Sequence, residues 1–89
     1  MAHSASAKKR IRQNATHRAR NRWRLRTMRE SIKAFEQSIA AGDAKAATET
    51  FRQCAAVIDR TAQKGVIHKN QAARRKSRLS ARLKALKNA

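Results

Sequence analysis

Proline and tyrosine are absent from this 89-residue chain, which has only two glycines, one cysteine and three aromatic side chains. A single cysteine cannot form an intrachain disulfide, which argues against a small secreted fold held by disulfides. No apolar run approaches the ~20 residues of a membrane span, and the first residues lack the apolar core of a signal peptide. The shortage of proline and glycine, with abundant Ala, Arg, Lys and Leu, favours a helical chain.

Acidic residues are also scarce, and their placement divides the chain by charge. All five lie in the middle of the chain: Glu30, Glu36, Asp43, Glu49 and Asp59. Residues 1–29 carry ten Lys/Arg and residues 64–89 carry nine, with no acid in either block, and the whole chain has a formal charge of +18. A near-neutral middle between two cationic ends predicts a small folded centre with two basic surfaces for a polyanion.

Two glycines mark the ends of the predicted helices. Gly42 and Gly65 suit the left-handed position that follows a helix, and Asp43 can cap the next one. The expected helices run from near Ser4 or Ser6 to Ala41, over about 43–64, and from Lys69 or Asn70 to Lys87. Short connections between three such helices predict an all-α fold, an antiparallel three-helix bundle, with residues 1–89 as a single domain.

Apolar residues recur at helical spacing in all three segments, which predicts the core of the bundle. The predicted core residues are Leu25, Met28, Ile32, Phe35, Ile39, Phe51, Cys54, Ile58, Leu79, Leu83 and Leu86. The apolar stripe of the first helix becomes polar before about residue 24. That helix is also ~22 Å longer than the second at 1.5 Å per residue. Residues 1–24 are therefore expected to form a basic helical extension, and residues 25–89 the bundle.

The basic ends have the chemistry that phosphate groups require. Fourteen of the 23 basic residues are arginines, whose planar fork binds phosphate with two hydrogen bonds. No zinc spacing, aromatic RNA-binding motif or GXXG loop indicates a module that reads base sequence. Basic arms around a small helical core therefore favour recognition of folded RNA by shape and backbone. A nucleoid-type DNA-binding protein is the alternative, and a membrane-active peptide would need an apolar face that residues 8–24 lack.

Other chemistry-bearing side chains are isolated. His3, His17 and His68 are too dispersed for a metal site, and the acids form no catalytic pair, so no enzyme activity, metal or cofactor is expected. Cys54 falls on the apolar stripe and is expected to be a buried structural thiol. Trp23 points away from that stripe. It either covers an edge of the bundle or, as we expect, contacts the partner by stacking on a base.

The two ends of the sequence resemble a known family. Ser6-Ala-Lys-Lys-Arg-Ile-Arg-Gln-Asn14 and Lys64-Gly-Val-Ile-His-Lys-Asn-Gln-Ala-Ala-Arg-Arg-Lys-Ser-Arg-Leu79 are similar to the bacterial small-subunit ribosomal protein family numbered twenty. The resemblance covers essentially the whole chain. It implies a three-helix bundle that binds 16S ribosomal RNA directly, at the 5′ domain and the long penultimate stem, in the cytoplasmic ribosome. Few protein contacts, no membrane and no small-molecule substrate are expected.

Charge and resemblance together give a set of expected RNA-binding residues. The first basic surface comprises Lys8, Lys9, Arg10, Arg12, Asn14, His17, Arg18, Arg20, Arg22, Trp23, Arg24 and Arg26. The second comprises Lys64, His68, Lys69, Asn70, Arg74, Arg75, Lys76 and Arg78. The expected mechanism is electrostatic clamping, in which the two surfaces neutralise phosphates from separate RNA segments and so help the subunit to assemble.

Overall fold

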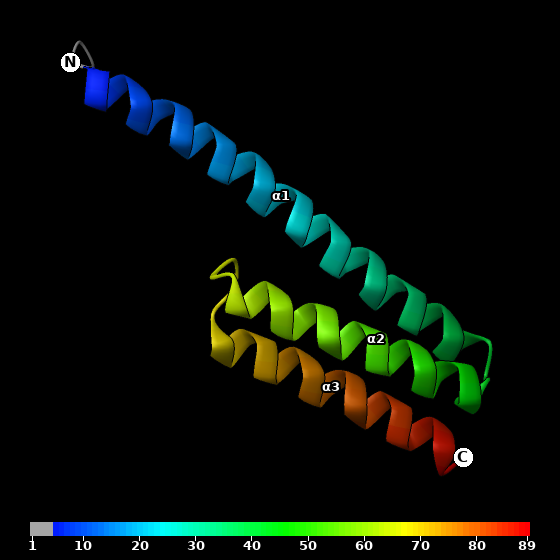
Figure 1. The fold of residues 1–89 in the computed structure, drawn as a ribbon. Coiled ribbons are helices and arrows are strands. Elements are labelled where there is room, and N and C mark those ends of the chain that lie inside the picture. The colour runs from blue at the N-terminus through cyan, green and yellow to red at the C-terminus, as the bar shows by residue number, and fades with distance from the viewer. Residues whose placement is uncertain (1–4) are drawn as a thin grey trace.

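The computed structural model describes residues 5–89, which form three α-helices joined by two short connections (Figure 1). The helices are α1 (Ala5–Ala40), α2 (Ala44–Gln63) and α3 (Lys69–Lys87). The predicted all-α fold is confirmed, and the observed ends differ from the expected ones by at most one residue. Ser4, one of the two expected start points, and His3 lie outside the described residues.

The connection between α1 and α2 has the predicted geometry. Gly42 adopts a φ of 74°, in the left-handed region that favours glycine, and its N–H donates to the Ile39 carbonyl over 3.0 Å. Asp43 then caps α2, because its Oδ1 accepts a hydrogen bond from the Ala46 N–H over 3.1 Å. This tight turn reverses the chain and makes α2 antiparallel to α1.

The connection between α2 and α3 closes the other end of the bundle. Gly65 adopts a φ of 77°, and the Val66 N–H donates to the Thr61 carbonyl over 3.2 Å. Ile67 is buried against the core, so the connection folds back onto the bundle. The chain then enters α3 at Lys69 and runs parallel to α1.

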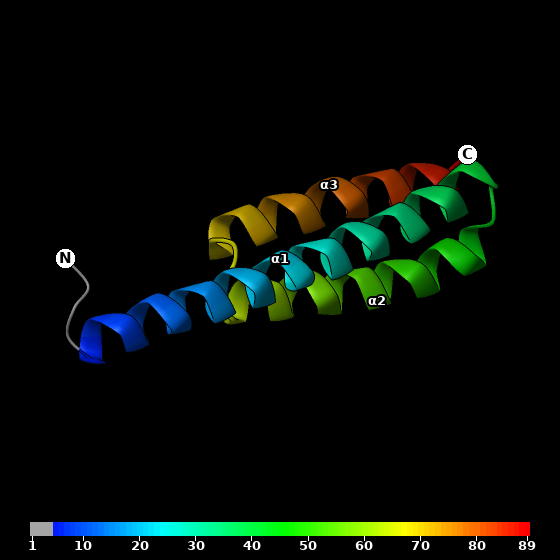
Figure 2. The ribbon, with the colours of Figure 1, turned by 90° about the horizontal axis from the view of Figure 1, so that it is seen from above.

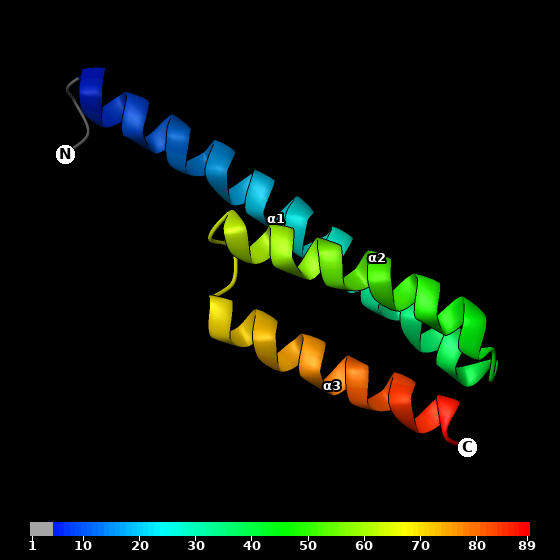
Figure 3. The same ribbon diagram turned by 60° about the horizontal axis from the view of Figure 1, so that its bottom comes forward.

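The helices form an up-down-up bundle in which α2 packs against both neighbours. In Figure 1 α2 lies between α1 and α3, whereas in Figure 2 α1 is seen between α3 and α2, so the helices form a triangle and not a flat layer. The backbones of α1 and α3 approach each other closely at few points. Figure 3 shows that the end of α2 that leads into α3 lies beside the middle of α1. A groove lies between α1 and α3, and side chains of both helices line it.

The core lies where the three apolar stripes meet. Its largest fully buried side chains are Phe35 and Met28 on α1 and Ile58 and Cys54 on α2, and α3 contributes Ala72, Leu79 and Leu83. The rings of Phe35 and Phe51 pack at an angle of 58°, with their centroids 5.8 Å apart. Five predicted core residues are only partly buried at the rim of this cluster: Leu25, Ile32, Ile39, Phe51 and Leu86.

The N-terminal half of α1 projects beyond the bundle. Residues 8–23 are all exposed, a length of about 24 Å at 1.5 Å per residue. Figures 1–3 show the N-terminal part of this segment with no other helix beside it, whereas Trp23, at its end, lines a pocket with residues of α2. The molecule consequently measures 63 × 22 × 16 Å, with a radius of gyration of 17.6 Å. A compact chain of this length would have ~12 Å, so the shape is that of a rod attached to a small bundle.

Candidate nucleic-acid interface

The projecting segment of α1 is a cationic helix that faces solvent on every side. Residues 8–23 hold seven Lys/Arg and no acid, and every one of these side chains is exposed. Like-charged neighbours four residues apart, such as Arg18 and Arg22, repel each other by ~0.2–0.5 kcal/mol per pair. The extension buries nothing in return, so within its own chain it has no source of stability beyond helix propensity.

The face that packs on α2 and α3 continues into the extension with polar side chains. Asn14, His17 and Asn21 occupy the positions at which the apolar spacing would place buried residues. They are exposed, because the bundle ends before it reaches them. These amide and imidazole groups are free to donate hydrogen bonds to phosphate or ribose oxygens.

A basic stripe on α1 extends further along the chain than the sequence analysis proposed. Arg22, Arg26, Arg29 and Lys33 lie together around a shallow depression, which Glu30 also lines. Arg29 and Lys33 were not among the expected site residues. Arg29 lies three residues after Arg26, and Lys33 four after Arg29, a helical spacing that is visible in the sequence.

The second basic surface lies on α3 and opens onto the groove between α1 and α3. Gln71, Arg74, Arg75 and Arg78 line one depression on α3. Arg75 and Arg78 also line the groove itself, with Ile32 and Leu79 at its base. Arg82 and Glu36 complete the lining of that groove.

Arg75 is the most confined cation of this surface. It is half-buried, and its Nε is buried without a hydrogen-bond partner among residues 5–89. A buried guanidinium nitrogen left unpaired is costly, because it has lost water and gained no acceptor. The position of Arg75 therefore suits an acceptor supplied from outside the chain.

Two ion pairs attach α3 to the other helices. Lys76 Nζ lies 2.7 Å from Asp59 Oδ1 on α2, and Arg82 Nη1 lies 3.2 Å from Glu36 Oε1 on α1. A third pair, between Arg52 and Glu49, lies within α2. Lys76 is an expected RNA-binding residue, and in this structure its charge is directed to Asp59.

His68 has a structural role that the sequence analysis did not propose. It is the N-cap of α3, and its Nδ1 accepts a hydrogen bond from the Asn70 N–H over 3.0 Å. Nδ1 therefore carries no proton in this arrangement, and Nε2–H remains as the exposed donor. Histidine is not among the usual capping residues, so the capping role of His68 is seen only in the structure.

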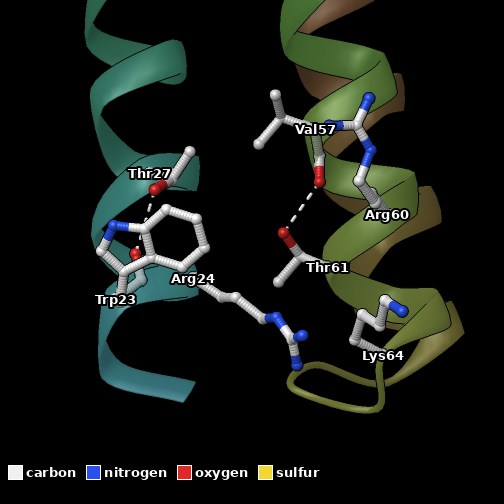
Figure 4. A pocket seen from close by; sticks show the side chains of 7 residues that line it. All are labelled: Trp23, Arg24, Thr27, Val57, Arg60, Thr61 and Lys64. Atoms are coloured by element: carbon white, nitrogen blue, oxygen red, sulfur yellow. Dashed lines mark hydrogen bonds between the residues drawn. The ribbon is translucent and has the colours of Figure 1, made fainter. Parts of the chain in front are cut away.

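Trp23 lies at the edge of the bundle beside α2. Its side chain is 64% exposed, and it lines a pocket with Arg24 and Thr27 of α1. The α2 side of the pocket is formed by Val57, Arg60, Thr61 and Lys64 (Figure 4). Trp23 faces outward as expected, and it lies at an edge of the bundle, which was the alternative stated for it; contact with a partner stays a prediction.

Cys54 is fully buried in the core, as predicted. Burial raises the pKa of its thiol, a hydrogen bond from the Ser31 hydroxyl opposes that shift, and the charge of Glu36 adds to it. The Ser31 Oγ lies 3.7 Å from Cys54 Sγ. The thiol is kept protonated and unreactive, so it belongs to the core and not to the interface.

The structure brings the expected residues to the surface but not to one place. All of them are exposed except Arg24, Arg75 and Lys76, which are half-buried. Those on α1 occupy the extension and its junction with the bundle. Lys64 and His68 flank the α2–α3 connection, and the others lie along the first half of α3.

Residues 5–89 show neither a group of metal ligands nor a helix fit to span a membrane. No three His, Cys, Asp or Glu side chains are grouped closely enough to hold a metal ion. None of the three helices combines the length and apolar character that crossing a membrane requires.

Comparison with known proteins supplies the identity of the fold. The sequence pattern of the family described as Ribosomal protein S20 matches residues 2–84. The small ribosomal subunit protein bS20 of Nitrosomonas europaea is 50% identical over 86 residues, which are 97% of this chain and 99% of that protein. The bS20 proteins of Bordetella petrii and Acinetobacter baylyi are 51% and 54% identical over 97% of this chain, with 99% and 97% of their own lengths covered. These matches confirm the resemblance at the two ends of the sequence, and the chain belongs to the ribosomal protein S20 family.

Proposed function

We propose that this chain is a structural constituent of the small ribosomal subunit, in the cytoplasm, that binds 16S ribosomal RNA directly. It has no catalytic role, in keeping with its family. By contacting separate RNA segments with its two basic surfaces, it holds those segments together and so assists assembly of the subunit. The segments implied by the family resemblance are the 5′ domain and the long penultimate stem.

The observation that carries this proposal is the unpaired charge of the α1 extension. Residues 8–23 are cationic and fully exposed, and they have no carboxylate partner in the described chain. Arg75 adds a buried Nε without an acceptor in the groove between α1 and α3. The phosphates of an RNA backbone are suited to both features. Their negative charges, arranged along a line, match the cations of the extension, and their oxygens accept hydrogen bonds from guanidinium groups such as that of Arg75.

The separation of the two basic surfaces supports the clamp. The extension reaches about 24 Å beyond the bundle, whereas the whole of α3 lies within the bundle, packed mainly against α2 (Figure 1). RNA bound along the extension therefore does not cover the far end of α3. The bundle core fixes the distance between the two contacts, since α1 enters it without a break at Met28 and Phe35.

Competition binding tests the proposal. Labelled fragments of 16S RNA compete with duplex DNA for the protein at matched ionic strength. We expect the RNA fragments to bind more tightly and one protein to hold two separate fragments in a single complex. Equal affinity for duplex DNA would favour the nucleoid-type alternative, and complexes limited to one fragment would contradict the clamp.

A further inference from the structure

The pocket beside Trp23 has features that the clamp by the two basic surfaces does not explain. It lies between α1 and α2, on a different flank of α1 from the groove that α3 borders. Its volume is about 200 Å³, below the ~300–1,000 Å³ of sites that enclose a whole drug-sized ligand. A pocket of this size has room for a single ring system.

The walls of the pocket are apolar. Figure 4 shows the Trp23 ring directed toward the gap between the helices, opposite Thr61 and below Thr27. The Thr27 hydroxyl donates to the Trp23 carbonyl over 3.0 Å, and the Thr61 hydroxyl donates to the Val57 carbonyl over 2.7 Å. Because both hydroxyl protons are already used within the helices, the threonines offer methyl groups, beside the side chain of Val57.

The rim of the pocket is cationic. Arg24, Arg60 and Lys64 line it, and none of the seven lining residues is acidic. Figure 4 shows Arg24 extending toward Lys64 across the lower end of the pocket. None of the three cations has a carboxylate partner in the described part of the chain. An apolar slot with one aromatic wall and a positive rim is complementary to a flat ring that carries a negatively charged substituent.

We propose that this pocket receives one unpaired base of the RNA, stacked on Trp23, with the adjoining phosphates bound by Arg24, Arg60 and Lys64. The inference rests on the proposed RNA-binding function and adds a single-nucleotide site to it. A nucleotide is the occupant because it carries both parts that the pocket complements, a π face and a phosphate. The base is unpaired, since only bases splayed out of a helix expose their faces to side chains.

Substitution of Trp23 gives the first test. We expect Trp23→Ala to weaken binding to 16S RNA by about 5- to 150-fold, which corresponds to ~1–3 kcal/mol for one stacked base. Trp23→Phe, which keeps an aromatic face, should lose less. The matched control is Ile11→Ala, because Ile11 is the other large apolar side chain exposed on α1 and does not line this pocket. That control should lose much less affinity than Trp23→Ala, because it removes no wall of the pocket.

Intrinsic fluorescence gives the second test, because Trp23 is the sole tryptophan of the chain. Binding of an RNA with unpaired nucleotides should quench Trp23 and protect it from acrylamide, whereas a fully paired RNA duplex should do neither. Chemical probing should find one base protected by the native protein and reactive with Trp23→Ala, while backbone protections elsewhere persist. Circular dichroism checks that the variants keep their helices.

The outcomes separate this inference from the function on which it rests. If the native protein prefers 16S RNA to duplex DNA, but Trp23→Ala binds within twofold and Trp23 stays open to acrylamide, the nucleotide site is wrong and the proposed function stands. Equal quenching by duplex RNA, or loss of protection across the whole RNA in Trp23→Ala, also overturns the site. If the native protein shows no preference for 16S RNA, the proposed function itself fails.

Discussion

His68 occupies two roles at once, at the scale of a single residue. Its Nδ1 caps α3 by accepting from the Asn70 N–H, and its exposed Nε2 remains free to donate to a phosphate. The first N–H groups of a helix have no partner within the helix, so a cap stabilises the end at which α3 begins. The imidazole thus fixes the start of the helix that carries the second basic surface.

Removing this cap should destabilise the bundle. We expect His68→Ala to lower the free energy of unfolding by about 1 kcal/mol, and His68→Asn to restore it, because asparagine is a strong N-cap. Urea unfolding followed by circular dichroism measures both. His17→Ala is the matched control, since His17 lies on the exposed extension and should leave the transition unchanged. Identical midpoints for His68→Ala and the native protein would refute the capping role.

Cys54 should make stability depend on pH in the alkaline range. The pKa of the thiol is raised in the folded protein by burial, so the folded state keeps its proton where the unfolded state has lost it. The stability due to this difference is fully present below the unfolded pKa of ~8.5 and is lost as pH rises through the folded pKa. Urea midpoints measured from pH 7 upward should therefore fall more steeply for the native protein than for Cys54→Ala. Parallel curves would contradict the assignment.

Some residue roles in this chain follow from local sequence, whereas others depend on how the helices pack. The buried Cys54 and the Asp43 cap were predictable, because each depends on local spacing or on a standard capping residue. The Lys76–Asp59 pair and the unpartnered Nε of Arg75 were not. Both depend on how α3 is rotated against its neighbours, which is a property of side-chain packing and not of residue order.

At the scale of the elements, α1 is two segments with different sources of stability. From Met28 to Phe35 the helix is held by the core, whereas residues 8–23 are all exposed and contribute no residue to the core. Most helical stability in proteins comes from packing of an apolar face, which the extension lacks, and like charges weaken it further. The extension therefore opens locally at a smaller free-energy cost than the bundle.

Amide hydrogen exchange should reveal this difference. We expect the amides of residues 8–23 to exchange much faster than those of α2 in the free protein, and to slow when 16S RNA binds. The α2 amides serve as the internal control, because their rates should change little on binding. An extension protected as strongly as α2 without RNA would show that it is stable on its own.

The existence and order of the helices were predictable because the residues that end and cap the helices are unambiguous. Gly42, Asp43 and Gly65 have the conformations that the sequence predicted, and the apolar stripes identified the buried faces. The groove between α1 and α3 was not predictable, nor was the pocket that places Trp23 against Val57. Both arise from the angles at which the helices pack, and sequence periodicity determines faces without determining angles.

At the scale of the whole molecule, charge and shape act together. The rod and the bundle spread a formal charge of +18 over 63 Å, so the cations face several directions. Each phosphate that is neutralised releases counterions, which makes RNA affinity fall steeply with salt. The slope of log affinity against log salt therefore measures how many phosphates the protein contacts.

Paired substitutions should separate the two surfaces. Arg22→Gln with Arg26→Gln, and independently Arg74→Gln with Arg78→Gln, should each reduce the slope of log affinity against log salt by about 2, roughly 1 per lost phosphate contact. Footprinting should show that each pair exposes a different set of nucleotides. Lys45→Gln with Arg52→Gln removes the same charge from α2 and should leave the footprint unchanged. Loss of the same nucleotides in both surface variants would contradict two separate contacts.

The unbroken course of α1 has a consequence for its length. The helix contains 36 residues and no glycine or proline, so it has no kink site that could compensate for an inserted residue. One alanine inserted after Asn21 would advance the extension by only ~1.5 Å but turn it by ~100° about the helix axis. Every basic side chain of the extension would then point to a different side, although none had been replaced. Such an insertion should harm RNA binding more than any single substitution, and seven added residues, which nearly restore the rotation, should harm it less. The number of residues between the core and the extension therefore sets a rotational phase as well as a distance.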